Sequence, residues 1–248
     1  MKALVTGASS GIGYDIAVEL DSLGYDIIAV ARNIDRLSEL KSRLKNNTQI
    51  ITADLSVPEN CIALYSLRVC KIDVLVNNAG FGLIGEFCES DLNRELEMIN
   101  TNITAVHILT KLFLKDMKAA NKGYILNVAS IAGFMPGPLM ATYYASKAYV
   151  VRLTQAIRKE LQKSRSDVKI SLLCPGPVHT RFNQTAGVEF NLKSLDSKYV
   201  ASYAVSKMLK NKPVILPGLS IKLARFGGKF LPDSFLAEIA YHMQKKKI

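Results

Sequence analysis

The chain is poor in cysteine and has no cysteine pattern of the kind that builds disulfide frameworks or metal sites. Its 248 residues include four cysteines, which are scattered along the sequence at Cys61, Cys70, Cys88 and Cys174. None forms a CxxC pair. We therefore expect no metal, and reduced thiols that pack as small apolar side chains in a cytoplasmic protein.

Long hydrophobic runs are absent as well. No stretch reaches the about 18 apolar residues that a membrane-spanning helix needs. The apolar start of the chain breaks at Gly7, too early for an export signal. We also find no internal repeat and no low-complexity linker, so we expect one domain over residues 1–248.

Acidic residues are in short supply, with 21 Asp and Glu against 32 Lys and Arg, for a net charge of +11. Such an excess can attract nucleic acid, anionic membranes, acidic proteins or phosphate groups. The basic residues are spread along the whole chain and match no nucleic-acid-binding motif, so we expect no nucleic-acid partner. Charge alone does not choose among the other partners.

Apolar residues, in contrast, are plentiful, at 49% of the chain. Nearly continuous apolar runs, typical of strands covered on both faces, occur at 2–5, 26–31, 49–52, 74–77, 123–128, 168–173 and 213–216. Segments with helical periodicity lie between them, at 12–23, 34–44, 92–118 and 143–162. This alternation predicts an α/β fold, a single-domain doubly wound parallel sheet of the Rossmann-like type with helices on both faces. Ligands of such sheets bind beyond the carboxyl ends of the strands.

A glycine-rich turn follows the first predicted strand and leads directly into a helix. It has the spacing GxxxGxG and contains Gly7, Ser9, Ser10, Gly11, Ile12 and Gly13. Glycines there let the backbone approach a pyrophosphate at the positive end of the following helix. An ordinary strand-to-helix turn is the alternative.

Arg32 stands at the end of the second predicted strand, where NAD-binding folds carry an acidic residue for the adenosine ribose. A guanidinium at that position can bind a 2′-phosphate, and no carboxylate is there to repel one. We therefore predict NADP(H) as the cofactor. A surface arginine at a helix start is the alternative.

Tyr143 and Lys147 are four residues apart at the start of a predicted helix, so they share one face. A tyrosine is a poor base at neutral pH, but a nearby ammonium favours its ionised form and makes it a usable acid–base group. Ser130, after the fifth predicted strand, could donate a hydrogen bond to a substrate oxygen. The YxxxK pattern alone is common on solvent-exposed helices, but its combination with Ser130 and the glycine-rich turn is not.

Together these motifs resemble the short-chain dehydrogenase/reductase family. The resemblance runs from residue 1 to about residue 180 and rests on residues 6–13, Asp54-Leu55, residues 77–80, Asn102, Ser130, Tyr143, Lys147 and Pro175-Gly176. It implies that Asp54 and Leu55 border the adenine, and that Asn78, Ala79 and Gly80 line the cofactor path. It also implies a proton relay through water held by Asn102, cofactor contacts by Tyr143 and Lys147, and a carboxamide site at Pro175, Gly176, Val178 and Thr180. A homodimer or homotetramer packed through 92–118 and 143–162 is implied as well.

The substrate is less well specified. The segment 181–200 is expected to cover it, and apolar side chains occur there and in the loop after Ser130, namely Phe182, Val188, Phe190, Leu192, Phe134, Met135, Leu139 and Met140. We expect a carbonyl reductase that acts on a small hydrophobic ketone or aldehyde. A 3-oxoacyl reductase acting on an acyl carrier protein or CoA thioester is the alternative, and a non-catalytic NADP-binding sensor is a further one.

The C-terminal extension, residues 219–248, departs from the pattern of the oxoacyl reductases. A helix should begin at Pro232-Asp233, with Phe235, Leu236, Ile239 and Met243 on one side. This segment contains six basic residues and two acidic ones. We favour a flap over the substrate pocket or a subunit contact. A peripheral membrane contact is the alternative.

Overall fold

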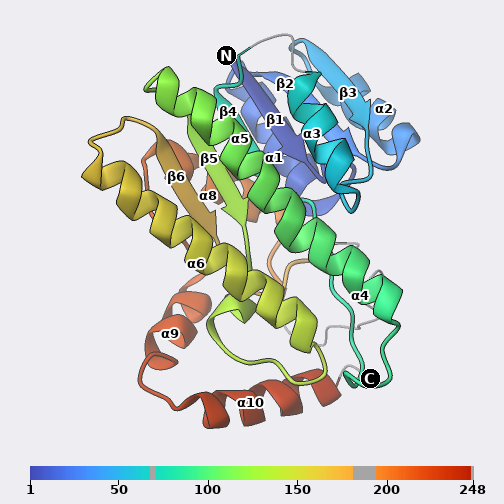
Figure 1. The fold of residues 1–248 in the computed structure, drawn as a ribbon, viewed down its shortest axis with the longest axis vertical. Coiled ribbons are helices and arrows are strands. Elements are labelled where there is room, and N and C mark those ends of the chain that lie inside the picture. Colours follow the sequence, from blue (N-terminus) through green and yellow to red (C-terminus); the bar gives the residue numbers. More distant parts are fainter. Residues whose placement is uncertain (68–70, 181–193, 247–248) are drawn as a thin grey trace.

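Seven parallel strands form a single sheet in the order β3-β2-β1-β4-β5-β6-β7 (Figure 1). The computed structural model describes residues 1–67, 71–180 and 194–246. Each strand lies within one residue of its expected ends: β1 (Lys2–Thr6), β2 (Asp26–Ala31), β3 (Thr48–Thr52), β4 (Val74–Asn77), β5 (Tyr124–Val128), β6 (Lys169–Leu173) and β7 (Val214–Ile215). The strand order reverses between β1 and β4, which places the ligand-binding crevice of such a sheet beyond their carboxyl ends.

Helices cover both faces of the sheet. Packed on one face are α1 (Gly11–Ser22), α2 (Ile34–Arg43) and α8 (Ser197–Leu209). The other face carries α3 (Pro58–Ser66), α5 (Ala105–Ala119) and α6 (Ala141–Lys163). The predicted Rossmann-like, doubly wound fold class is confirmed.

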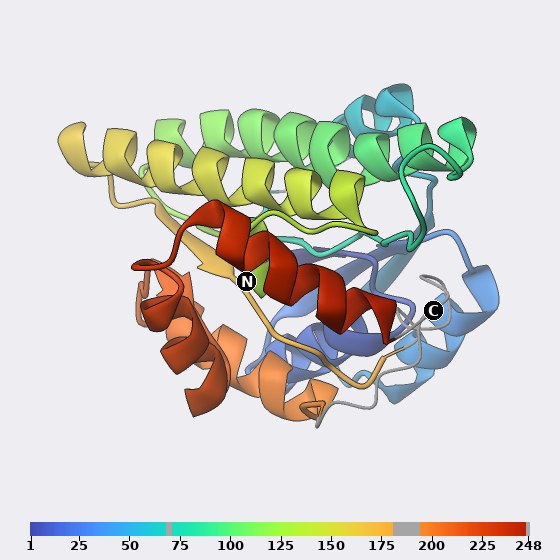
Figure 2. The same cartoon turned by 90° about the horizontal axis from the view of Figure 1, so that it is seen from below.

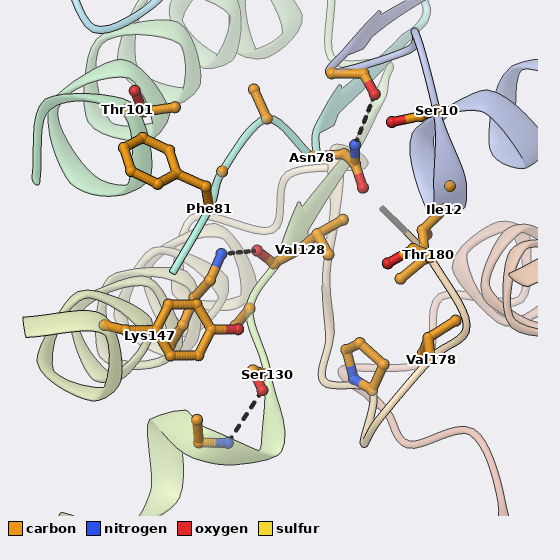
Figure 3. A pocket seen from close by; sticks show the side chains of 18 of the residues that line it. Ser10, Ile12, Asn78, Phe81, Thr101, Val128, Ser130, Lys147, Val178 and Thr180 are labelled. Atoms are coloured by element: carbon orange, nitrogen blue, oxygen red, sulfur yellow. Dashed lines mark hydrogen bonds between the residues drawn. The ribbon is translucent and has the colours of Figure 1, made fainter. Parts of the chain in front are cut away.

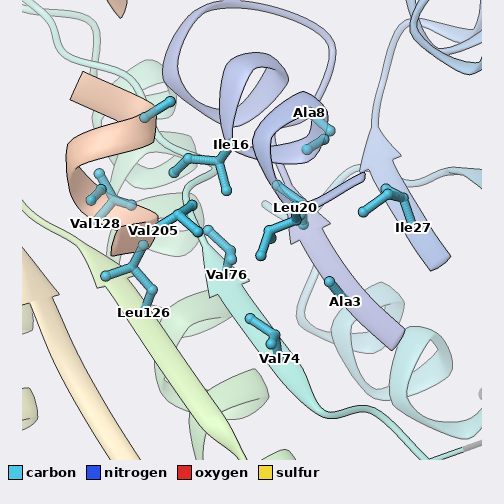
Figure 4. Packing of buried hydrophobic residues seen from close by; sticks show 14 of the residues in the cluster. Ala3, Ala8, Ile16, Leu20, Ile27, Val74, Val76, Leu126, Val128 and Val205 are labelled. Atoms are coloured by element: carbon cyan, nitrogen blue, oxygen red, sulfur yellow. The ribbon is translucent and has the colours of Figure 1, made fainter. Parts of the chain in front are cut away.

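Alternate residues of each strand serve the two faces, as the pleat requires. Ala3 and Val5 of β1 join the core under α1 and α8, whereas Leu4 joins the core under α5. Figure 4 shows Ile16 and Leu20 of α1 packed above the strands. Complete burial of one such aliphatic side chain contributes about 1.5–3 kcal/mol, so these clusters hold the strand ends that carry the candidate site in place.

The long helix expected over 92–118 is interrupted. Helix α4 (Leu92–Ile99) passes into a π-helical turn (Asn100–Thr104) before α5 begins. The apolar spacing did not reveal this turn, because a single wide turn changes the direction of the side chains without ending the helix. Its consequence is local: it holds Asn102 in a fully buried position.

The C-terminal residues form two helices at the end of the molecule opposite the N-terminus, α9 (Leu219–Gly227) and α10 (Asp233–Lys245) (Figures 1 and 2). Helix α10 begins where the sequence predicted. Its buried residues, however, are Leu236, Ala240 and Gln244, so most of the predicted apolar side faces outward. Of the expected covering segment, 197–200 belong to α8 and 181–193 lie outside the described residues.

Candidate active site

A cleft with a volume of about 630 Å³ lies at the carboxyl edge of the sheet. It is lined by residues from the ends of β1, β2, β3, β4, β5 and β6, which are far apart in sequence. Eighteen of the twenty predicted site residues line it: Gly7, Ser9, Ser10, Gly11, Ile12, Arg32, Asp54, Leu55, Asn78, Ala79, Gly80, Ser130, Tyr143, Lys147, Pro175, Gly176, Val178 and Thr180. Gly13 and Asn102 do not belong to the lining.

The glycine-rich turn is tied to the end of β4 by hydrogen bonds. The Thr6 hydroxyl donates to the Val76 carbonyl at 3.2 Å and accepts from the Asn78 and Ala79 amides at 2.9 and 3.1 Å. The Asn78 side chain in turn donates to the Thr6 carbonyl at 3.1 Å and to the Gly7 carbonyl at 3.3 Å. These bonds fix the loop before any ligand binds.

Two glycines of this turn have distinct physical roles. Gly7 has a φ of +65°, a left-handed conformation that favours glycine. Gly13 is buried, and a side chain there would collide with the Asn78 amide and the Gly7 carbonyl. Gly13 therefore allows close packing behind the loop, which explains why it lies outside the lining.

The first turn of α1 opens onto the cleft. Ser10 occupies the N-cap position, and its side chain makes no capping hydrogen bond within the part of the chain that the structure describes. The first amides of a helix have no partner inside the helix, and the helix dipole adds positive potential there. This arrangement is suited to a phosphate group.

Two arginines border the cleft at the end of β2. Arg32 lines it, and so does Arg36, whose backbone amide is capped by the Asn33 side chain at 2.9 Å. Asp54 lines the same end. Burial works to raise the pKa of Asp54, but hydrogen bonds from Ser56 and the charge of Arg32 outweigh it and hold that pKa below its usual value.

Tyr143 and Lys147 lie at the other end of the cleft, one turn apart on α6. Both are buried, and the Lys147 Nζ lies 5.8 Å from the centre of the Tyr143 ring. The Lys147 ammonium donates to the Val128 carbonyl at 3.2 Å (Figure 3). Burial lowers the pKa of Lys147 to about 8. Burial also raises the pKa of Tyr143, and a hydrogen bond with the Ser130 side chain acts in the opposite direction.

Asn102 stands behind this end of the cleft. Its side chain accepts from the Phe81 amide at 3.1 Å and donates to the Phe81 carbonyl at 2.9 Å and to the Ser146 hydroxyl at 3.0 Å. It therefore joins the loop after β4 to the first turns of α6. Thr101, its neighbour in the π-helical turn, lines the cleft instead.

Several lining residues were not among the predicted ones. Arg36 lies in the first turn of α2, four residues after Arg32, and could have been found from that proximity in the sequence. Phe81 directly follows the motif at residues 77–80. Met243 and Gln244 come from α10, more than 60 residues after the last motif in the sequence, and no local pattern connects them to the cleft. Only tertiary structure brings them there.

The apolar loop after Ser130 contributes less than expected. Met140 lines the cleft, whereas Phe134 packs on another core cluster and carries the Arg225 guanidinium 4.0 Å above its ring. The apolar residues predicted between 182 and 192 lie outside the described residues. Among residues 1–67, 71–180 and 194–246, no group of histidine, cysteine or acidic side chains could hold a metal ion. None of the helices described is long and apolar enough to cross a membrane.

Known proteins of similar sequence are oxidoreductases. Residues 1–189 match the short chain dehydrogenase family. An uncharacterized oxidoreductase of Staphylococcus epidermidis is 32% identical over 224 residues, which cover 89% of this chain and 96% of that protein. A probable NADP-dependent dehydrogenase of Haemophilus influenzae is 36% identical over 178 residues, 70% of each chain.

Solved structures agree with this assignment. A short-chain dehydrogenase from Sphingobium yanoikuyae in complex with NADPH has a TM-score of 0.82 and 28% identity, covering 94% of this chain and 97% of that one. A short-chain dehydrogenase/reductase from Burkholderia phymatum in complex with NAD has a TM-score of 0.82 and 26% identity, covering 90% and 91%. The bulky-bulky ketone specific alcohol dehydrogenase from Comamonas testosteroni has a TM-score of 0.79 and 27% identity, covering 94% and 95%. The chain belongs to the short-chain dehydrogenase/reductase family of oxidoreductases.

Proposed function

We propose that this protein reduces the carbonyl group of a small hydrophobic molecule, or oxidises the corresponding secondary alcohol, with NADP(H) as its cofactor. One observation carries the proposal: Tyr143, Lys147 and Ser130 line one end of a cleft whose other end is bordered by Arg32 and Arg36. A proton-transfer group and a phosphate-binding group thus share one continuous site.

The residues present suit a dinucleotide phosphate. The turn at Gly7 and the first amides of α1 suit the pyrophosphate, and Arg32 and Arg36 offer two guanidinium groups for a 2′-phosphate. Asp54 would border the adenine. The dehydrogenase of Haemophilus influenzae is named as NADP-dependent, and the structure from Burkholderia phymatum holds NAD. Cofactor preference therefore needs a direct test on this protein.

The proton chemistry follows from the burial of the two helix residues. When bound, the reduced nicotinamide supplies a hydride for the carbonyl carbon. Because the pKa of Tyr143 is raised by burial, its phenol keeps its proton at neutral pH and can donate it to the carbonyl oxygen. The Ser130 hydroxyl can hydrogen-bond to the same oxygen. Lys147, with a pKa of about 8, is mostly an ammonium at neutral pH. Its charge stabilises the phenolate that forms when Tyr143 donates its proton.

Asn102 supports this arrangement as a positioning residue. It holds the Phe81 backbone and the Ser146 hydroxyl, and Ser146 immediately precedes Lys147. We propose that its side chain fixes the distance between the β4 loop and α6. A water held near Asn102 in a proton relay to Lys147 is part of the same proposal.

An apolar substrate suits the lining near Tyr143. Phe81, Met140 and Tyr144 pack in one cluster with Tyr143, and Met243 and Gln244 also line the cleft. The dehydrogenase from Comamonas testosteroni, described as specific for bulky-bulky ketones, supports a ketone as the substrate class. A 3-oxoacyl thioester would use the same three residues, so it belongs in the substrate test.

We further propose a cytoplasmic homodimer or homotetramer packed through α5 and α6. The two helices lie side by side on one face of the molecule (Figures 1 and 2). Light scattering would give the oligomeric state directly.

The test of the proposed function is a panel of ketones, aldehydes and 3-oxoacyl thioesters, each with NADPH and with NADH. We expect oxidation of NADPH with hydrophobic ketones or aldehydes and slower oxidation of NADH. If no carbonyl compound promotes oxidation of either cofactor although both bind, the protein is a binding protein and not a reductase.

A further inference from the structure

Large apolar side chains are concentrated on the outside of α9, α10 and their connection. The exposed residues are Leu219, Leu223, Phe226, Phe230, Leu231, Phe235, Ile239 and Met243, which we call the C-terminal apolar surface. Phe230 is 73% exposed, and the Phe226 and Phe230 rings contact edge to face with centroids 5.3 Å apart. Large exposed apolar side chains gathered on two successive helices mark an interaction site rather than ordinary surface.

The exposure does not result from a detached segment, because the other sides of both helices are packed. Ile221 of α9 fills the space beside Gly176, and Arg225 stacks on Phe134. On α10, Leu236 and Ala240 are buried, and Gln244 donates to the Tyr144 hydroxyl at 2.6 Å. Both helices therefore contact the rest of the fold, α10 through buried residues and α9 through Ile221 and Arg225, and the C-terminal apolar surface faces outward.

The segment that carries this surface has a positive net charge. Residues 219–248 contain six basic residues, Lys222, Arg225, Lys229, Lys245, Lys246 and Lys247, against Asp233 and Glu238. The Glu238 carboxylate lies 2.9 Å from the Nε2 atom of His242, one turn further along α10. Exposed Phe and Leu side chains flanked by Lys and Arg are typical of segments that lie in the interface of an anionic membrane.

We propose that the C-terminal apolar surface docks on an anionic lipid surface. A second copy of the chain is a poorer occupant, because a twofold contact would place the basic segment against its own equivalent. Interfaces between proteins are also depleted in lysine, which supplies five of the six basic residues of this segment. Lipid headgroups complement the charge, and acyl chains complement the Phe and Leu side chains.

Docking through this surface would place the cleft beside the membrane. Met243 belongs both to the C-terminal apolar surface and to the cleft lining, and it is 42% exposed. A hydrophobic carbonyl compound dissolved in the lipid could enter the cleft along α10. This last step rests on the function proposed above, whereas docking itself does not.

Co-sedimentation of the full chain with vesicles, without substrate or cofactor, tests the docking. Vesicles of phosphatidylcholine mixed with phosphatidylglycerol are compared with vesicles of phosphatidylcholine alone, at about 0.1 M and about 1 M salt, where the Debye length falls from about 10 to about 3 Å. We expect binding to the mixed vesicles at low salt, weaker by about ten-fold or more at high salt.

Two variants and one control locate the surface. Phe226→Ser with Phe230→Ser removes the apolar contact, and Lys229→Glu with Lys245→Glu and Lys246→Glu reverses the charge. Each should weaken vesicle binding by about ten-fold or more. Ile62→Ser is the matched control, since Ile62 is 53% exposed and belongs to α3, a helix that Figure 1 shows apart from α9 and α10. It should bind vesicles as the unmodified chain does.

Four results would overturn the proposal. One is the absence of binding to mixed vesicles, and another is unchanged binding by the Phe226→Ser, Phe230→Ser variant. The third is a lower oligomeric state of that variant by light scattering, with no vesicle binding by the unmodified chain, which would make the surface a subunit interface. Binding of purified acyl carrier protein in place of vesicles would likewise assign it to an acidic protein.

Discussion

The Gln244 side-chain amide donates a 2.6 Å hydrogen bond to the hydroxyl of Tyr144, a residue 100 positions earlier in the chain and next to Tyr143. Both side chains are buried and both line the cleft. Removing one partner of a hydrogen bond between buried groups is costly in free energy, because the other group stays buried without a partner. The contact therefore couples the position of α10 to the substrate end of the cleft.

The first prediction concerns this contact. Gln244→Ala should loosen α10 over the cleft and raise the KM for the carbonyl substrate by about 5–30-fold, the equivalent of about 1–2 kcal/mol. The dissociation constant of NADPH should change little, since α10 lies at the other end from Arg32. His242→Ala, on the exposed side of the same helix, is the control. A loss of NADPH affinity equal to the rise in KM would show that Gln244 supports the whole fold instead.

A second prediction concerns cofactor choice. A charge-assisted contact to a 2′-phosphate is worth about 1.5–3 kcal/mol, so Arg32→Ala and Arg36→Ala should each weaken NADPH binding by about 10–100-fold. NADH binding should be nearly unchanged. Arg43→Ala is the matched control, because Arg43 lies at the end of α2 and pairs with Glu39 on the protein surface. Equal affinity of the unmodified chain for both cofactors, measured by fluorescence titration, would refute the assignment to NADP(H).

The third prediction concerns pH and stability. Burial lowers the pKa of Lys147 from 10.5 to about 8, so between these values the unfolded chain binds more protons and the free energy of unfolding should rise with pH. Lys147→Met removes this dependence. At about 1.4 kcal/mol per pKa unit, the variant should be more stable than the unmodified chain by up to a few kcal/mol at pH 7, less the lost bond to Val128. The advantage should shrink towards pH 10.

Urea unfolding at several pH values measures this difference. Lys163→Met, an exposed lysine on the same helix, is the control for the loss of a lysine as such. A Lys147→Met variant whose stability relative to the unmodified chain is the same at pH 7 and pH 10 would show that the ammonium is not buried as the structure has it.

The strands and the cleft could be predicted from the sequence because their signals are local. A parallel strand covered on both faces requires a continuous apolar run, and Val74–Asn77 has one. The glycine-rich turn and the Tyr143–Lys147 spacing are also complete within a few residues. The regular alternation then predicts a parallel sheet, whose strand ends carry the motifs to one edge, whereas the strand order comes from the structure.

The parts that could not be predicted depend on contacts between distant segments. The π-helical turn at Asn100–Thr104 preserves the apolar spacing on both sides of it, so the sequence showed one helix. On α10, hydrophobicity favoured Phe235 and Ile239 as buried residues, but packing against the cleft selected Ala240 and Gln244. Ala240 and Gln244 are buried there because the helix lies close to Tyr144. A small side chain fits at this short distance, and the Gln244 amide donates a hydrogen bond to the Tyr144 hydroxyl.

The most direct test of the whole account is the rate of NADPH oxidation by Tyr143→Phe with a carbonyl substrate found in the panel. The variant keeps the ring that fills the site and loses only the proton donor, so NADPH should bind as before while kcat falls by about 10²–10⁴-fold. Tyr144→Phe, which leaves the proton donor in place, should retain most of its kcat. Full activity of Tyr143→Phe on that substrate would contradict the mechanism.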